Sequence, residues 1–289
     1  MQRIINIKVP DTGTFINFIV GGQMLEINSN QNPLIKEIKS LNRKKNRWAN
    51  RLFIIEGIKI IEEAIINEIK IKNIIISDSF LNSQDGALFY EGIKSRDNLV
   101  KVSDILFKSI SDTENPQGIM AICEFNIRNL SEIDNFDKSS ILFLDGIQDP
   151  GNMGTIIRTA DAFNIDGIIL GEGSVDPYNP KVVRSTMGSI FRVPLYILNN
   201  SIESIIELKY KGFYILATSL DGISIYDIDF GKKFVCIIGN EANGVDPKIM
   251  DIADKKTKIP MPGNAESLNA GVAASIIMYE AMRSRNMYL

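Results

Sequence analysis

Hydrophobic positions along this chain of 289 residues form short unbroken runs that alternate with helical patterns. The runs Leu52–Glu56, Ile71–Ser77 and Gly118–Phe125 predict strands, and the stretches Ile58–Asn67 and Ser103–Ser111 predict helices. Strands that alternate with helices in this way are typical of a small α/β unit.

A second α/β pattern begins with the apolar strand Ile141–Leu144. Further elements are expected over Met153–Phe163 (helix), Gly167–Leu170, Phe213–Ala217 and Phe234–Ile238 (strands), and from Ser267 to about Arg283 (helix). Short, fully apolar strands separated by helices predict a parallel sheet covered on both faces.

The composition changes at two places along the chain. Residues 126–139 are polar and are expected to link a domain over 24–125 to one over 140–289. Residues 1–23 do not resemble the rest of the chain; they are expected to be either an extension or the product of a start upstream of Met24. A chain that begins at Met24 is expected to fold.

The chain contains no histidine and two cysteines. Catalytic triads and general bases that use histidine are therefore excluded, and a metal site is not expected. Cys123 and Cys236 lie in separate apolar runs and are expected to be buried free thiols, which fits a cytoplasmic protein. No apolar run approaches the ~20 residues of a membrane span. With a net charge of −3, any contact with nucleic acid must come from a local patch.

Three segments carry candidate chemistry. In the first, Asn152 stands where a Gly- and Pro-containing turn opens a helix, and Arg158 follows about two turns later. Arg158 could point toward the strand ends, where sites of α/β proteins form. It could equally be a solvated helix residue, with Asn152 as the helix cap.

The second segment, Gly239–Glu241, ends an apolar strand with a carboxylate flanked by glycines. The third, Lys258–Asn269, is a loop stiffened by prolines before a helix rich in small residues, and Ser267 is its expected N-cap. Ordinary turn chemistry explains each segment equally well when it is taken alone. The glycine motifs of phosphate-binding loops and of dinucleotide-binding turns are absent from the sequence.

Together, Asn152 with Arg158, Gly239–Glu241 and Ile259–Asn269 occur in the order and spacing of the three motifs of the SpoU/TrmH family. Over residues 24–289 the chain resembles this family of RNA ribose 2′-O-methyltransferases of the SPOUT class. The resemblance implies an α/β fold: a C-terminal parallel-sheet domain with a trefoil knot, a rare exception among folds, and a smaller N-terminal α/β domain that binds the substrate. It also implies a homodimer to which the C-terminal helix contributes.

The resemblance implies S-adenosyl-L-methionine as cofactor, bound by three loops with much backbone contact. The expected cofactor-binding residues are Thr218, Ser219, Leu220, Ile238, Gly239, Asn240, Glu241, Ile259, Met261, Ser267 and Leu268. The expected catalytic residues are Arg158, Asn152, Glu241, Ser267 and Asn269. The family assigns removal of the 2′-hydroxyl proton to the arginine that matches Arg158. Because a guanidinium stays protonated, we expect Arg158 instead to stabilise the developing alkoxide or to hold a phosphate.

A basic stretch between about Leu34 and Arg51, expected to form one helix as far as Ala49, is the best candidate for RNA contact. The candidates are Lys36, Lys39, Arg43, Lys44 and Arg47 in this helix, with Lys181 and Arg184 near the active site by resemblance. A solvated helix face is the alternative for these cations. Trp48 could stack on a base, although a buried ring is the favoured interpretation.

Large-subunit ribosomal RNA is the favoured target, because the added domain resembles those of ribosomal RNA modifiers, and transfer RNA is second. One alternative is a relative that binds RNA but has lost catalysis, against which the intact motif residues argue. The other alternative is an unrelated α/β enzyme that acts on a small molecule.

Overall fold

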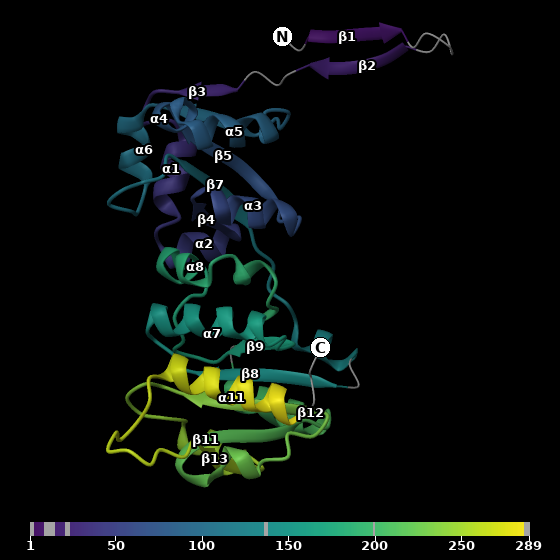
Figure 1. Ribbon diagram of the computed structural model, residues 1–289, viewed down its shortest axis with the longest axis vertical. Helices are drawn as coiled ribbons and strands as arrows, with labels where there is room; N and C mark the ends of the chain where they lie inside the picture. The colour runs from purple at the N-terminus through teal and green to yellow at the C-terminus, as the bar shows by residue number, and fades with distance from the viewer. Residues whose placement is uncertain (1–2, 9–14, 21–23, 136–137, 199, 286–289) are drawn as a thin grey trace. The chain divides into compact units, whose positions relative to one another are not determined.

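The computed structural model describes residues 3–8, 15–20, 24–135, 138–198 and 200–285 (Figure 1). The chain divides into two compact units, Met1–Phe125 and Asn126–Leu289. Ahead of the first unit's main sheet, the strands β1 (Arg3–Lys8) and β2 (Phe15–Val20) pair antiparallel.

The first unit is built on a five-stranded mixed sheet in the order β3-β6-β5-β7-β4. Its strands are β3 (Leu25–Ile27), β4 (Leu52–Glu56), β5 (Ile71–Ser77), β6 (Leu99–Val102) and β7 (Ile119–Glu124). β3, β6 and β5 run parallel, and β7 runs antiparallel to both β5 and β4. Its helices are α1 (Pro33–Ser40), α2 (Lys44–Asn50), α3 (Ile58–Ile66), α4 (Asp78–Asn82), α5 (Gln84–Ile93) and α6 (Asp104–Ile110). Apolar side chains of α1 and α6 pack on one face of this sheet.

The basic stretch is two helices and not the single helix that the sequence predicts. α1 ends at Ser40, and Arg43 adopts an extended conformation before α2 begins. The break places Leu41 in the core. Side chains of α2 also bond the last carbonyls of α1: Arg47 Nη1 donates to the Leu41 carbonyl at 2.7 Å and Asn46 Nδ2 to that of Ser40 at 2.9 Å. These contacts satisfy carbonyl groups that a helix end leaves without partners.

The second unit contains a six-stranded, fully parallel sheet in the order β10-β9-β8-β12-β11-β13. The strands are β8 (Ser139–Asp145), β9 (Gly167–Leu170), β10 (Leu195–Ile197), β11 (Tyr214–Ser224), β12 (Lys233–Gly239) and β13 (Lys255–Lys258). The helices are α7 (Pro150–Ala162), α8 (Pro180–Thr186), α9 (Ser201–Tyr210), α10 (Pro247–Ile252) and α11 (Ala270–Ser284). Side chains of α9 and α10 join the core on one face of the sheet, while α7 and α11 lie side by side across the other (Figure 1). The parallel sheet expected from the apolar strands is therefore present.

Several boundaries differ from the sequence expectation: α7 begins at Pro150 and not near Met153, and β11 runs to Ser224 instead of ending at Ala217. The last helix begins at Ala270 and is capped by Asn269, whose Oδ1 accepts the Val272 N–H at 3.2 Å, so Ser267 is not its cap. In the polar segment 126–139, Leu130 and Ile133 are buried in the core of the second unit. These two apolar positions attach that stretch to the second unit, although its average composition is that of a linker.

Cys123 and Cys236 are both free and buried, as predicted, and burial raises the pKa of the Cys236 thiol to about 12.

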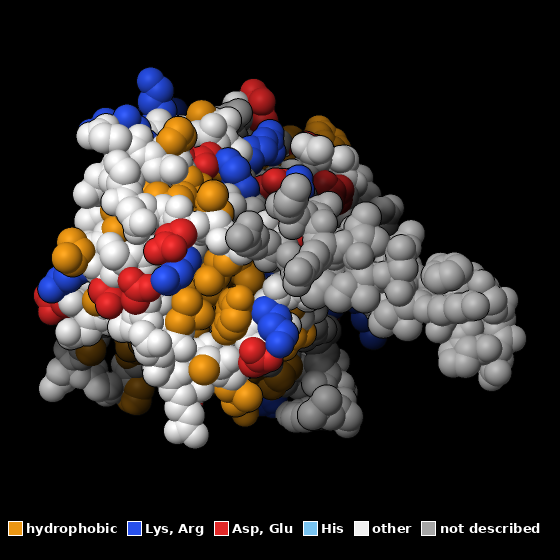
Figure 2. Space-filling view, turned by 90° about the horizontal axis from the view of Figure 1, so that it is seen from above, with side chains coloured by type: hydrophobic (Ala, Val, Ile, Leu, Met, Phe, Trp, Pro, Cys, Tyr) orange, Lys and Arg blue, Asp and Glu red, His pale blue; other side chains and the backbone are white. Residues whose placement is uncertain are grey.

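Among the described residues, no helix is both long and apolar enough to cross a membrane. In the same residues, no group of three or more Cys, Asp or Glu side chains could hold a metal ion. On the face seen in Figure 2, apolar side chains lie between groups of both charges, so positive charge does not cover that face as a whole.

Candidate active site

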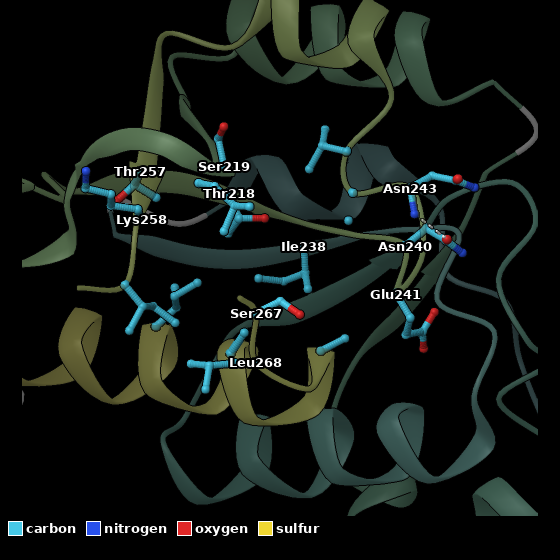
Figure 3. Close-up of a pocket in the computed structure, with 18 of the residues that line it drawn as sticks. Thr218, Ser219, Ile238, Asn240, Glu241, Asn243, Thr257, Lys258, Ser267 and Leu268 are labelled. Carbon is cyan, nitrogen blue, oxygen red and sulfur yellow. Dashed lines mark hydrogen bonds between the residues drawn. The ribbon is translucent and has the colours of Figure 1, made fainter. Parts of the chain in front are cut away.

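An irregular segment within β11 and the loops that follow β12 and β13 line a cavity of about 760 Å³ (Figure 3). The volume lies within the range of roughly 300–1,000 Å³ usual for small-molecule sites. All eleven residues predicted to bind the cofactor line it: Thr218, Ser219, Leu220, Ile238, Gly239, Asn240, Glu241, Ile259, Met261, Ser267 and Leu268. Three sequence segments, each about 17 residues from the next, are thus brought together toward the carboxyl ends of neighbouring parallel strands.

The loop after β12 is held by Asn240. Its backbone exchanges two hydrogen bonds of 2.9 Å with Gly244, and its Oδ1 accepts the N–H groups of Ala242 and Asn243. The side-chain Nδ2 also donates to the Gly146 carbonyl at 2.7 Å, which ties this loop to the segment after β8. A Cβ atom at Gly239 would lie 2.2 Å from the carbonyl carbon of Gly244. Glycine is therefore needed where the turn closes on β12.

Glu241 connects this loop to the start of α7. Its carboxylate accepts the backbone N–H groups of Gln148 and Asp149, each at 3.2 Å, and the Asn152 Nδ2 at 2.9 Å. Partial burial alone would raise the pKa of Glu241, but the hydrogen bonds from Asn152, Gln148 and Asp149 outweigh it and lower that pKa. Glu241 is therefore held as a carboxylate that joins the second motif to the first.

β11 itself reaches the cavity through an irregularity in the strand. The pairing of β11 with β13 shifts register between Thr218 and Ile223, so Ser219–Gly222 bulges from the ladder. Thr218 Oγ1 donates to the Ile237 carbonyl at 3.0 Å, and the Ser219 hydroxyl bonds the Asp221 carboxylate. The bulge places hydroxyl groups at the end of the cavity beside Thr257 and Lys258 (Figure 3).

Three of the predicted catalytic residues occupy other places. Arg158 is exposed on α7 and does not line the cavity. Asn152 lies beside the cavity, bonded to Glu241, and Asn269 caps α11. α7 and α11 approach closely because Gly271 lies against Asn152 and Thr155, and Thr159 Oγ1 is 3.1 Å from Ser275 Oγ. Within one chain the structure therefore brings Ser267 and Glu241, but not Arg158, to the cavity.

The residues predicted to contact RNA differ in their exposure to solvent. Lys36, Lys39, Arg43 and Lys44 are exposed, and Lys39 donates to Asn30. Arg47 is only 2% exposed and bonds a backbone carbonyl, so its assignment to RNA contact is wrong. The ring of Trp48 packs edge-on against Phe125 at 5.4 Å between centroids, which supports the buried alternative. In the second unit Lys181 is exposed and Arg184 is half-buried, both on α8.

Two carboxylates outside the predicted set also shape the site. Asp149 caps α7 by accepting the Asn152 N–H at 2.8 Å, and Asp145 Oδ2 accepts the Asp246 N–H at 2.7 Å. The Asp-Pro order at 149–150 is a helix-start signal from which the first could have been found. The second depends on the juxtaposition of β8 and β12, for which the sequence gives no local signal. Side chains of Met250 and Ile277, from α10 and α11, complete the apolar lining.

Comparison with known proteins agrees with this geometry. Residues 139–279 match the SpoU rRNA Methylase family, and residues 32–121 match the MRM3-like substrate binding domain. The 23S rRNA (guanosine(2553)-2′-O)-methyltransferase RlmP of Bacillus subtilis is 35% identical over 257 residues, which cover 89% of this chain and 98% of that protein.

Two solved structures share the fold over nearly their whole length. The AdoMet-bound rRNA methyltransferase of Sinorhizobium meliloti superposes with a TM-score of 0.79 at 34% identity, over 91% of this chain and 98% of that one. The SpoU methyltransferase AviRb of Streptomyces viridochromogenes, in complex with AdoMet, gives 0.80 at 26% identity, over 88% and 98%. Residues of the second and third motifs line one cavity and Asn152 of the first motif is bonded to Glu241 beside it, and the chain belongs to the SpoU rRNA methylase family.

Proposed function

We propose that this protein transfers a methyl group from S-adenosyl-L-methionine to a ribose 2′-hydroxyl of RNA, with large-subunit ribosomal RNA as the substrate. The observation that carries the proposal is the cavity lined by the irregular segment of β11 and by the loops after β12 and β13. The relatives of this chain, with a 2′-O-methyltransferase of 23S rRNA among them and AdoMet in two solved structures, support the same reaction.

The cavity's lining suits this cofactor. Apolar side chains of Ile238, Ile259 and Leu268 offer a surface for a purine ring, and the hydroxyls of Thr218 and Ser219 can bond a ribose. Glu241, held ionised, gives the site a negative group that suits a ligand carrying ammonium and sulfonium charges. When bound, the cofactor supplies a methyl group already activated for transfer.

The protein's part in the reaction is then to position the ribose and to stabilise its charge. We assign Arg158 to the alkoxide that develops at the 2′-oxygen, or to a neighbouring phosphate, because its guanidinium remains protonated. Glu241 and Asn152 act as positioning residues, since their hydrogen bond joins the cofactor loop to the helix that carries Arg158. Ser267 lines the cavity and can bond either ligand, while Asn269 fixes the start of α11.

We infer a homodimer formed through the second unit. Val272 and Tyr279 of α11 are 45% and 50% exposed although apolar, and their spacing of seven residues places them on one side of the helix. The Tyr279 ring also packs edge-on against Phe163 at the end of α7, with 5.8 Å between the centroids. Because α7 and α11 are neighbours, such a contact would place the exposed Arg158 beside the interface. Light scattering tests this inference: a monomeric mass for the active enzyme would contradict it.

We also propose that the second unit contains the trefoil knot that the family resemblance implies. α11 packs on α7, yet the preceding strand β13 lies at the far edge of the sheet. The segment 259–269 must therefore cross the ends of β11 and β12, a path that suits the proposed trefoil knot.

In the first unit we propose that exposed cations contact RNA phosphates, namely Lys36, Lys39, Arg43 and Lys44. In the second unit we propose the same role for Lys181 and Arg184.

The experiment that tests the function compares ribose methylation across total RNA from cells with and without this protein, and repeats the reaction in vitro with labelled cofactor. We expect one ribosomal site to lose methylation and to regain it when purified protein and cofactor are added. Methylation of transfer RNA alone would move the substrate to the second candidate. Cofactor binding without transfer to any RNA would favour the catalytically inactive relative.

A further inference from the structure

The outer edge of the second unit's sheet is strongly basic. β13 has the sequence Lys-Lys-Thr-Lys, and of these residues only Thr257 is buried. None of the ion pairs found within the described part of the chain includes Lys255, Lys256 or Lys258. In a protein of net charge −3, three exposed lysines in four residues form a local positive feature.

Two of these lysines face the same way. Side chains alternate along a strand, so Lys256 and Lys258 project from one face of β13. Both lie near Asp221: the hydrogen bond from Ser219 and then the charges of Lys256 and Lys258 lower the pKa of that carboxyl. Ser219 already bonds the Asp221 carboxylate, and Glu266 lines the cavity together with Lys258, so these two acids are found near the lysines.

Exposed apolar side chains are found on the part of β11 that pairs with β13 and just beyond its end. The end of β11 pairs with β13, with Ile223 opposite Thr257 and Ser224 opposite Lys258. Leu220, in the β11 bulge, is 70% exposed, and Tyr226, two residues past Ser224, is 65% exposed. Cations beside an exposed aromatic ring suit single-stranded nucleic acid, because lysines neutralise phosphates while the ring stacks on a base.

This surface adjoins the cavity. Leu220 and Lys258 line it, and Figure 3 shows Lys258 beside Thr257 and Ser219, at the end remote from Asn240 and Glu241. A strand of RNA that lies along β13 would therefore lie next to residues that line the cavity.

We propose that the β13 edge surface, formed by Lys256, Lys258, Leu220 and Tyr226, binds single-stranded RNA that flanks the methylated nucleotide. The inference rests on the proposed function and adds a substrate contact on the catalytic unit itself. The competing explanation is that the lysines only prevent β13, an edge strand, from pairing with another chain. Edge protection requires no exposed aromatic ring and predicts no effect on RNA affinity.

The test measures the affinity of the full chain for fragmented, end-labelled large-subunit ribosomal RNA at several salt concentrations. The variant Lys256→Gln/Lys258→Gln is compared with Lys138→Gln/Lys232→Gln, which makes the same charge change at the amino ends of β8 and β12. We expect the first variant to bind about tenfold more weakly. Its salt dependence should fall by about 1.4 in slope, since each phosphate contact on a single strand contributes about 0.7. The control should bind like the wild type.

A second pair of variants keeps the inference testable if the lysine variant self-associates. Tyr226→Ala should weaken RNA binding several-fold, and Tyr226→Phe, which retains the ring, should not. Equal affinity for all four variants and the wild type, or an equal loss in the lysine control, would overturn the inference. Self-association of the lysine variant with unchanged binding by Tyr226→Ala would establish edge protection instead. If the wild type neither binds nor methylates the RNA, the proposed function fails, and not this surface alone.

Discussion

The two candidate surfaces of this protein are built in opposite ways. In the second unit, residues far apart in sequence converge on one cavity, and Glu241 alone joins three N–H groups from the segment 148–152. In the first unit, the five predicted RNA-contact residues lie within twelve positions of sequence, yet one of them is buried and the others are spread over two helices and the break between them. Residues that are close in sequence therefore need not share a role, whereas residues at the ends of neighbouring strands can form one site although they are far apart in sequence.

The largest effect is expected at Arg158, because the proposed function assigns it to the charge that develops at the ribose 2′-oxygen. Its replacement tests whether a residue outside the cavity is catalytic. Arg158→Ala should lower methylation by roughly 10²- to 10³-fold, as removal of one charge-stabilising donor does, and leave cofactor affinity within about twofold. Single-turnover assays and calorimetry measure the two quantities. Arg158→Lys, which keeps the charge without the planar fork, should recover little. Near-normal turnover of the alanine variant would remove Arg158 from the mechanism.

Gly239 tests whether the backbone shapes the cavity. In Gly239→Ala the added Cβ would meet backbone atoms of Gly244 and Val245 at 2.2 and 2.3 Å, so the loop after β12 must move. Such overpacking costs about 1–3 kcal/mol, which corresponds to a roughly 5- to 150-fold loss of cofactor affinity if the loop absorbs it. Gly263→Ala is the matched control, because a Cβ there would meet nothing within 4 Å. Equal affinities for the two variants would contradict this account.

Glu241 tests the connection between the cofactor loop and α7. Glu241→Gln should lose about 1.5–3 kcal/mol of charge-assisted hydrogen bonding, or less because the side chain is partly exposed. Since the folded pKa of Glu241 lies below its ordinary value of 4.5, its stabilisation is present above that pH and is lost as pH falls through the folded pKa. Thermal unfolding of both proteins from neutral to acid pH measures this. The difference in unfolding temperature between the wild type and Glu241→Gln should narrow below pH 4.5. Glu172→Gln, an exposed control, should unfold at the same temperature as the wild type.

The smallest effects should separate the cations of the first unit. Arg47→Ala leaves the Leu41 carbonyl without its buried donor and should cost about 1–3 kcal/mol in the free energy of unfolding. Lys44→Gln should change stability by less than about 0.5 kcal/mol and weaken RNA binding. Denaturant titration and RNA-binding assays measure the two effects. A stable Arg47→Ala protein with weakened RNA binding would reverse our assignment of these residues.

The sequence alone determined the alternation of strands and helices, the buried thiols and the three motifs with their order. Those features depend on local periodicity and on residue types that each segment carries by itself. The elements α4, α5 and β6 between residues 78 and 102 were not predicted; in α5 only Gly86 and Ile93 are buried and Leu88 is exposed, so its apolar positions form no clear stripe.

Only the tertiary structure decided which side chains meet. The break at Leu41–Arg43 arises because Leu41 reaches the core and Arg47 turns back to bond its carbonyl. The joining of Glu241 to Asn152 depends on β12 lying beside β8, and the basic edge depends on β13 lying beside β11. Strand neighbours are chosen by the packing of the whole sheet, and no local stretch of sequence carries that information.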